Sequence, residues 1–250
     1  MIVLVTGASS GFGEEIARRF VREGHKVIAA ARRTDKLAAL RNELGANLLP
    51  VTLDVTDTAS IAQALAQLPA DWRTIDVLVN NAGLALGTEP AQECSLAEWQ
   101  TMIDTNVKGL VAMTHAMLPG MVARDSGTII NIGSIASSNA YPGGNVYGAT
   151  KAFVDQFTKN LRSDLVGTGV RSTVIAPGFS KGTEFWQVRL RGDTETAEKV
   201  HKGTVPLSTG DIAEAAYWVA SLPPHVNINF LEIMPTCQGY GPLTIKRKAL

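Results

Sequence analysis

Short apolar runs alternate along this chain with longer segments in which apolar residues recur every three to four positions. Such runs are typical of strands buried on both faces, and the periodic segments are typical of amphipathic helices. The runs predict strands at residues 2–5, 26–31, 48–53, 75–79, 128–132, 170–176 and 226–233. Helices are expected between them. The alternation predicts an α/β fold: a single doubly wound Rossmann domain over residues 1–250, with a seven-stranded parallel sheet and helices on both faces.

The second half of the chain contains one long helix whose details the sequence leaves open. Ser95 and Glu98 have the spacing of a capping box, which predicts a helix from there to about residue 122. Asn106 lies in its middle. With Gly109 nearby it could mark a kink that frees a backbone carbonyl, but the sequence favours an Asn that faces solvent. This helix and the one that contains Tyr147 are apolar on more than one face, which predicts packing against a second subunit.

Two stretches carry no periodic pattern. Residues 177–195 form a long irregular segment, and loops of this length are usually functional. We therefore expect a substrate loop over about residues 177–203, ending in a short helix near 194–203. Residues 235–250 look like an extended tail, and their basic cluster at 246–248 is expected to be a solvated end.

Composition narrows the class of protein. Hydrophobic residues make up 45% of the chain, and 23 basic residues balance 23 acidic ones, so the formal net charge is zero. This balance argues against a nucleic-acid partner or an anionic membrane surface. Cys94 and Cys237 fit no metal spacing and are expected to be free thiols. The first apolar run is too short for a signal peptide or a membrane span, which predicts a cytoplasmic protein. The cysteine spacing predicts no bound metal.

The first strand leads into a glycine-rich turn, TGASSGFG at residues 6–13, and a helix follows. Glycines let the backbone turn tightly beside a pyrophosphate, and a helix N-terminus offers free N–H groups to an anion. A merely tight turn is the alternative. The motif predicts cofactor contacts at Gly7, Ser9, Ser10, Gly11, Phe12 and Gly13.

The second strand ends at Arg32 and Arg33, where many NAD-binding folds carry an acid that binds the adenosine ribose. No acid is available at this point of the sequence, and two guanidinium groups can hold a 2′-phosphate. The pair therefore favours NADP over NAD, with two solvated arginines as the alternative. Further cofactor contacts are expected where the next strands end, at Asp54, Val55, Asn81, Ala82 and Gly83.

Candidate chemistry lies at Ser134, Tyr147 and Lys151. Tyr147 and Lys151 are four residues apart, so on a helix their side chains share one face. A nearby ammonium lowers the pKa of a phenol, which makes such a pair a tunable proton donor and acceptor. Ser134 could hold a carbonyl or alcohol oxygen beside the phenol. Chance occurrence of the Tyr-x-x-x-Lys spacing is the alternative for the pair alone.

Several motifs occur together in one order: residues 6–13, Asp54, NNAG at 80–83, Asn106, Ser134, Tyr147-x-x-x-Lys151 and Pro177-Gly178. With these motifs the chain resembles the short-chain dehydrogenase/reductase family over essentially its whole length. The resemblance implies hydride transfer between nicotinamide C4 and a carbonyl carbon, with Tyr147 as general acid/base. It also implies that Lys151 lowers the pKa of Tyr147 and binds the nicotinamide ribose, that Ser134 orients the substrate oxygen, and that Asn106 holds a water that relays protons. Further cofactor contacts are implied at Tyr147, Pro177, Gly178 and Thr183, and substrate contacts at Ser134, Tyr147 and Gly178.

A closer likeness concerns residues 84–87, 104–106, 144–153, 182–185, 188–189 and 227–232. These stretches look like those of bacterial NADP-dependent 3-hydroxy acid dehydrogenases, a subgroup that includes serine and allo-threonine dehydrogenases. The likeness implies NADP, a homotetramer and small anionic substrates. Ala176, Leu190 and residues 179–181 depart from the subgroup, which leaves the identity of the substrate open.

A small carboxylate substrate needs a cation in a nearly neutral protein. Arg189, in the irregular segment, is the best placed, because its planar fork matches a carboxylate or sulfonate; Lys181 and Arg191 are rivals. The sequence thus predicts an NADP-dependent oxidoreductase of small 3-hydroxy acids or the matching semialdehydes. A reductase of sulfoacetaldehyde or another small carbonyl compound, a sugar-nucleotide epimerase and an NADP-binding redox sensor are the alternatives.

Overall fold

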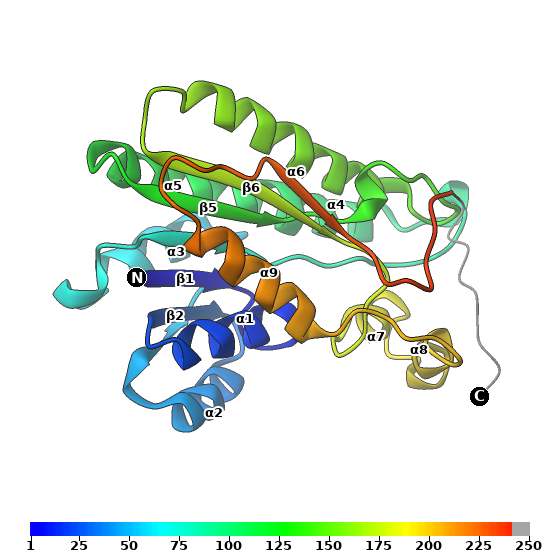
Figure 1. Cartoon of the computed structure of the whole chain (residues 1–250). Coiled ribbons are helices and arrows are strands. Elements are labelled where there is room, and N and C mark those ends of the chain that lie inside the picture. Colours follow the sequence, from blue (N-terminus) through cyan, green and yellow to red (C-terminus); the bar gives the residue numbers. More distant parts are fainter. Residues whose placement is uncertain (242–250) are drawn as a thin grey trace.

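Seven parallel strands form one continuous sheet in the computed structural model, which describes residues 1–241 (Figure 1). The strands pair in the order β3-β2-β1-β4-β5-β6-β7, so the predicted doubly wound α/β fold is confirmed. Their bounds are β1 (Ile2–Thr6), β2 (Lys26–Ala31), β3 (Leu48–Thr52), β4 (Val77–Asn80), β5 (Gly127–Ile132), β6 (Val170–Pro177) and β7 (Phe230–Ile233).

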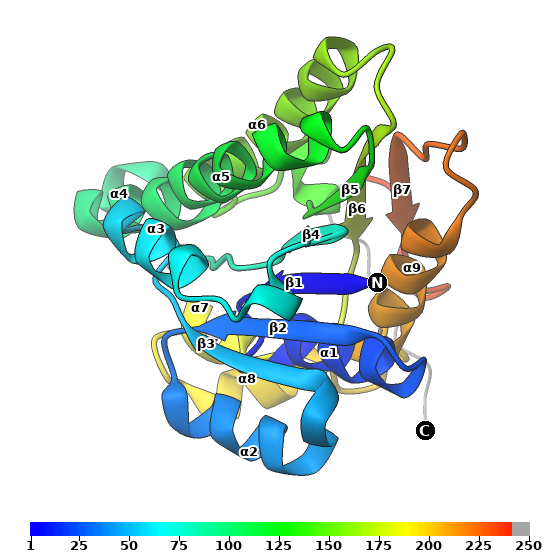
Figure 2. The ribbon, with the colours of Figure 1, turned by 90° about the vertical axis from the view of Figure 1, so that its left-hand side faces the viewer.

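Helices cover both faces of the sheet, as Figure 2 shows. Val3 and Val5 of β1 face α1 (Gly11–Arg22), α2 (Thr34–Leu44) and α9 (Thr209–Ser221) in one buried cluster. Leu4 points to the opposite face, where α3 (Thr58–Ala66), α5 (Leu110–Ala123) and α6 (Asn145–Asp164) pack. Successive side chains of a strand alternate between faces, so the short apolar runs bury residues on both sides.

The chain order reverses at β1, which has β2 on one side and β4 on the other. Open α/β sheets bind ligands in the crevice beyond the carboxyl ends of their strands at such a switch point. The predicted motifs at residues 6–13 and 80–83 follow β1 and β4, so the topology places both at this crevice.

The predicted helix over residues 95–122 is wrong as one regular helix. It consists of α4 (Leu96–Ile103), a π-helical turn η4 (Asp104–Gly109) and α5. The interpretation that Asn106 faces solvent is also wrong, because only 2% of the residue is exposed. Its amide accepts a hydrogen bond from Leu84 N (2.9 Å) and donates to Leu84 O (2.8 Å). The alternative of a local distortion near Gly109 agrees with the π-helical turn, which turns Asn106 towards the interior.

The predicted capping box at Ser95 is not formed, since the Ser95 side chain makes no capping hydrogen bond. The reason lies in a distant residue: the Glu98 carboxylate binds the Nε and Nη2 groups of Arg191 instead. A reciprocal capping box is present at Ser208 and Asp211, where it begins α9.

The irregular segment after β6 contains two short helices, α7 (Phe185–Arg189) and α8 (Thr194–Val200). The strand predicted at 226–233 is shorter, since β7 begins only at Phe230. Residues 246–248 lie outside the described residues. Within residues 1–241, none of the helices has the length and hydropathy needed to cross a membrane, and no group of three or more His, Cys, Asp or Glu residues is arranged for metal binding.

Candidate active site

A cavity of about 610 Å³ opens at the carboxyl ends of the strands and gathers most of the predicted site residues. Among the residues that line it are Gly7, Ser9, Ser10, Gly11, Phe12, Arg32, Arg33, Asp54, Val55, Asn81, Ala82, Gly83, Ser134, Tyr147, Lys151, Pro177, Gly178, Thr183 and Arg189. Gly13 and Asn106 do not line it. Both lie immediately behind its wall, where they support residues that do.

The glycine turn has the shape that its sequence predicts. Gly7 has φ +67°, a left-handed conformation that L side chains rarely adopt. A Cβ on Gly13 would lie 2.5 Å from the carbonyl oxygen of Gly7, so only glycine lets α1 begin this close to the turn. The Asn81 side chain then donates to Thr6 O at 2.9 Å, which joins the ends of β1 and β4. The turn is thus a tight cradle at a helix N-terminus, suited to a phosphate.

Arg33 lies at the same end of the cavity and is held in place by three acceptors. Its guanidinium donates to the hydroxyl groups of Ser9 (3.1 Å) and Ser10 (2.7 Å) and to the Glu184 carboxylate (2.9 Å). Arg32 is more exposed and lies 4.0 Å from Asp54. The prediction that no acid is available near these arginines is wrong for the folded chain, because Glu184 comes from the distant segment after β6.

Tyr147 and Lys151 project from α6 into the middle of the cavity, as their spacing predicts. The Lys151 ammonium donates to Ile132 O at 2.8 Å, and its Nζ lies 5.9 Å from the centre of the Tyr147 ring. Burial raises the pKa of Tyr147 to about 12, against the opposing effects of the Ser134 hydroxyl and the Arg189 charge. Burial lowers the pKa of Lys151 to about 8. The sequence predicts that the Lys151 ammonium lowers the pKa of Tyr147. The structure gives the opposite direction, because burial is the largest effect on this phenol.

The Asn106 side chain lies behind Gly83, near the Lys151 ammonium. A Cβ on Gly83 would lie 3.2 Å from Asn106 Oδ1 and 3.6 Å from Lys151 Nζ. Asn106 also donates to the Thr150 hydroxyl on α6 at 3.1 Å. The amide therefore ties η4, the segment after β4 and α6 together beside the Lys151 ammonium.

Of the three cations predicted as candidates for the substrate anion, Arg189 is the one that the structure places beside Tyr147. Only 3% of the residue is exposed, and its guanidinium carbon lies 5.8 Å from the centre of the Tyr147 ring. It donates to Gly87 O (3.0 Å), Gly143 O (2.8 Å) and the Tyr141 hydroxyl (2.8 Å). Of the rivals, Arg191 binds Glu89 and Glu98, Lys181 is exposed, and neither lines the cavity.

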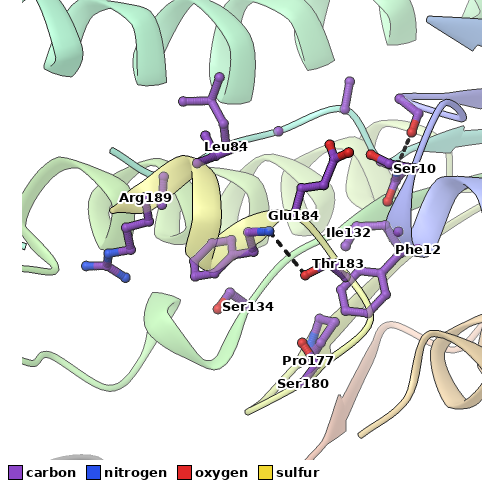
Figure 3. Close-up of a pocket in the computed structure, with 18 of the residues that line it drawn as sticks. Ser10, Phe12, Leu84, Ile132, Ser134, Pro177, Ser180, Thr183, Glu184 and Arg189 are labelled. Carbon is purple, nitrogen blue, oxygen red and sulfur yellow. Dashed lines mark hydrogen bonds between the residues drawn. The ribbon is translucent and has the colours of Figure 1, made fainter. Parts of the chain in front are cut away.

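Several cavity residues were not predicted to be site residues from the sequence, among them Tyr141, Glu184 and Gln238. Figure 3 shows Glu184 between Ser10 and Arg189, on the segment that carries α7. Gln238 comes from the tail after β7, and its side chain accepts a bond from Phe179 N at 2.7 Å. No local motif marks these residues, because their partners lie 48 to 151 positions away in the sequence.

The residues of the cavity fit NADP. The glycine cradle suits a pyrophosphate, Arg32 and Arg33 supply positive charge for a 2′-phosphate, and the crevice extends from them to Tyr147 and Lys151. At that end the cavity holds a proton donor and acceptor, a hydroxyl and a buried cation side by side.

Comparison with known proteins identifies the family of the chain. The family model described as short chain dehydrogenase matches residues 1–193. The NADP-dependent 3-hydroxy acid dehydrogenase YdfG of Salmonella typhimurium is 61% identical over 99% of this chain and 100% of its own length. Serine 3-dehydrogenase of Agrobacterium fabrum is 50% identical over 99% of this chain and 98% of its own length.

Solved structures give the same result. A closed form of serine dehydrogenase complexed with NADP+ has a TM-score of 0.96 at 60% identity, covering 99% of this chain and 100% of its own. Serine dehydrogenase from Escherichia coli has a TM-score of 0.86 at 57% identity, covering 96% of this chain and 100% of its own. The predicted enzyme class, an oxidoreductase, and the predicted cofactor, NADP, are confirmed. The chain belongs to the short-chain dehydrogenase family.

Proposed function

We propose that this enzyme oxidises a small 3-hydroxy acid, of the serine, allo-threonine or 3-hydroxypropionate type, or reduces the matching semialdehyde. The observation that carries the proposal is the buried Arg189 guanidinium beside Tyr147. A guanidinium has five N–H groups, and Arg189 donates three bonds within residues 1–241, so two remain for a ligand in this part of the chain. A planar pair of N–H groups matches a carboxylate. The names of the relatives agree with this substrate class.

The catalytic roles follow from the positions of three side chains. In oxidation, Tyr147 takes the proton of the substrate hydroxyl, and Ser134 holds the same oxygen. Lys151, buried against Ile132 O, supplies the positive charge that stabilises the phenolate. Bound NADP supplies the acceptor for the hydride that leaves the carbon. Asn106 holds the Leu84 backbone and the Thr150 hydroxyl beside Lys151, where a relayed proton would pass.

NADP is held by the residues that line the other end of the cavity. Gly7, Gly11 and Phe12 cradle the pyrophosphate, with Gly13 supporting the turn from behind. Arg32 and Arg33, with the Ser9 and Ser10 hydroxyls, bind the 2′-phosphate. Asp54, Val55 and residues 81–83 contact the adenosine portion and the nearby ribose, and Pro177, Gly178 and Thr183 lie along the nicotinamide.

Initial rates of NADP+ reduction with a substrate panel test the proposal. The panel is L-serine, D-serine, L-allo-threonine, 3-hydroxypropionate, 3-hydroxyisobutyrate, isethionate and a simple secondary alcohol. We expect much faster turnover of the acids than of the neutral alcohol. Turnover of the alcohol alone would refute the acid class. Tyr147→Phe should lower kcat by about 10³-fold in the same assay, since it removes the proton donor and keeps the ring.

A sulfonated substrate is the second candidate, because the two free N–H groups of Arg189 suit a sulfonate as well as a carboxylate. Oxidation of isethionate, or reduction of sulfoacetaldehyde with NADPH, at rates above those of the carboxylates would favour it. The oxidoreductase class of the chain argues against the third alternative, a redox sensor, which would bind NADP without turnover of any compound in the panel.

We also propose a cytoplasmic homotetramer of a single domain over residues 1–250. Apolar side chains are exposed on two parts of the surface: Ile103, Val122 and Phe153 on α4, α5 and α6, and Trp218 and Phe230 on α9 and β7. Figure 2 shows α4, α5 and α6 on one face of the sheet and α9 on the other, and β7 is an edge strand. A tetramer with two kinds of interface would cover both groups of exposed apolar side chains.

Light scattering should give four times the chain mass of 26.6 kDa. A monomeric mass contradicts the proposal. Cell fractionation tests the location.

A further inference from the structure

The Tyr141 side chain lies in the cavity wall beside Arg189, and the proposed reaction gives it no role. Its hydroxyl oxygen accepts a hydrogen bond from Arg189 Nη1 at 2.8 Å. The guanidinium carbon lies 5.3 Å from the centre of the Tyr141 ring and 5.8 Å from that of Tyr147. Tyr141 also packs against the buried cluster that contains Tyr147. Arg189 and both phenols therefore surround one part of the cavity.

The hydroxyl proton of Tyr141 is available for a ligand. A phenol can accept and donate, and the bond from Arg189 uses a lone pair of its oxygen. Within residues 1–241, no hydrogen bond from this hydroxyl to a protein acceptor is found. A cation that donates to the oxygen polarises the O–H bond, which makes the phenol a stronger donor. Tyr141 can therefore join the two free N–H groups of Arg189 in binding an anion.

Both donors are held in place by the protein itself. The carbonyl of Tyr141 accepts a bond from Gly144 N at 3.0 Å, and a Cβ on Gly144 would lie 3.0 Å from the Tyr141 ring, so the ring packs closely on that residue. Arg189 is fixed by the carbonyl oxygens of Gly87 and Gly143. Groups that are ordered before binding lose little conformational freedom when a ligand arrives.

We propose that Tyr141 and Arg189 form a two-residue clamp for the anionic group of the substrate, and that Tyr141 is a specificity-determining residue. The proposal rests on the proposed function and names a second donor for it. The clamp lies next to Tyr147, so it requires the anionic group and the reacting hydroxyl to be only a few bonds apart. Acids with the hydroxyl on C3 meet this requirement, and acids whose hydroxyl lies many bonds from the carboxylate do not.

The test is Tyr141→Phe, which removes one oxygen and keeps the ring that packs on Gly144. KM and kcat are measured at saturating NADP+ for 3-hydroxypropionate and for 1,3-propanediol, in which a neutral alcohol replaces the carboxylate. We expect KM for the acid to rise about tenfold, the loss of one hydrogen bond to a charged group. We expect kcat to change by less than about twofold, and KM for the diol to stay constant.

The inhibition constant of propionate should rise by the same factor as the KM of the acid. Tyr217→Phe, which alters a tyrosine that does not line the cavity, is the matched control.

Three outcomes overturn the clamp. An unchanged or lower KM for the acid shows that Tyr141 donates nothing to it. An equal rise for the acid and the diol shows that Tyr141 only maintains the cavity. Arg189→Lys and Arg189→Leu separate the two proposals: if they raise the acid KM and Tyr141→Phe does not, the clamp fails and the acid substrate class stands. If none of the three variants raises it, Arg189 does not bind the anionic group, and the observation that carries the proposed function fails as well.

Discussion

Replacement of Arg33 by Ala should convert an NADP-selective protein into one that binds both cofactors similarly. The Arg33 side chain is 40% exposed and is held by Ser9, Ser10 and Glu184 through one bond each. Two of its five N–H groups remain for the 2′-phosphate. A hydrogen bond to a charged group contributes about 1.5–3 kcal/mol. Because Arg33 is partly exposed, solvent screening reduces this contribution towards the lower end of that range. A loss of about 2 kcal/mol weakens NADPH binding about 30-fold.

The assay is quenching of intrinsic tryptophan fluorescence by NADPH and by NADH, since Trp186 lines the cavity. The dissociation constant of NADH should change by less than about twofold, because NADH lacks the 2′-phosphate. Glu184→Gln serves as the partner variant: removing the carboxylate beside Arg33 should tighten NADPH binding by up to about fivefold, within the range of a solvent-exposed charge interaction. Equal weakening of NADPH and NADH by Arg33→Ala would refute the reasoning, because the residue would then act on the shared part of the cofactors.

Three further predictions concern residues behind the cavity wall. Gly13→Ala places a Cβ 2.5 Å from Gly7 O and should weaken NADPH binding at least about tenfold in the same titration. Asn106→Ala leaves the N–H and C=O of Leu84 without their partner, so the free energy of unfolding should fall by about 3 kcal/mol in urea denaturation. Burial lowers the pKa of Lys151 to about 8 and the charge of Asp155 opposes this effect. Asp155→Asn therefore lowers that pKa further, and the alkaline limb of the kcat/KM profile should move to lower pH; an unchanged limb would contradict this.

The strands, the glycine turn and the Tyr147–Lys151 pair could be predicted because each depends on neighbours in the sequence. A buried parallel strand is an apolar run, and two side chains four apart share a helix face whatever surrounds them. Arg189 as the substrate-binding cation stays a prediction. The structure places it in the cavity wall and pairs its rival Arg191 with Glu89 and Glu98.

The errors share one cause, which is a partner far away in the sequence. Glu98 has the spacing to cap a helix, but Arg191 binds it more strongly through two N–H groups. Asn106 has the polarity of a surface residue, but the π-helical turn directs it to the backbone of Leu84. Glu184 binds Arg33 across 151 positions. Periodicity reports which face of an element is buried, and it contains no information about which distant side chain meets a polar group there.

One short segment, residues 183–189, connects the two ends of the site. Thr183 lies against the glycine turn, 3.1 Å from where a Cβ on Gly11 would be, and Glu184 pairs with Arg33. The Phe185 ring is 5.6 Å from that of Tyr147, and Arg189 reaches the substrate end. Substitutions in this segment should therefore alter cofactor and substrate constants together. Ser134 lies in the turn after β5, and Tyr147 and Lys151 lie on α6, so the proposed proton-transfer groups belong to other elements than residues 183–189. Under the proposed function, changes in residues 183–189 therefore alter substrate and cofactor binding without replacing the groups that carry the proposed chemistry.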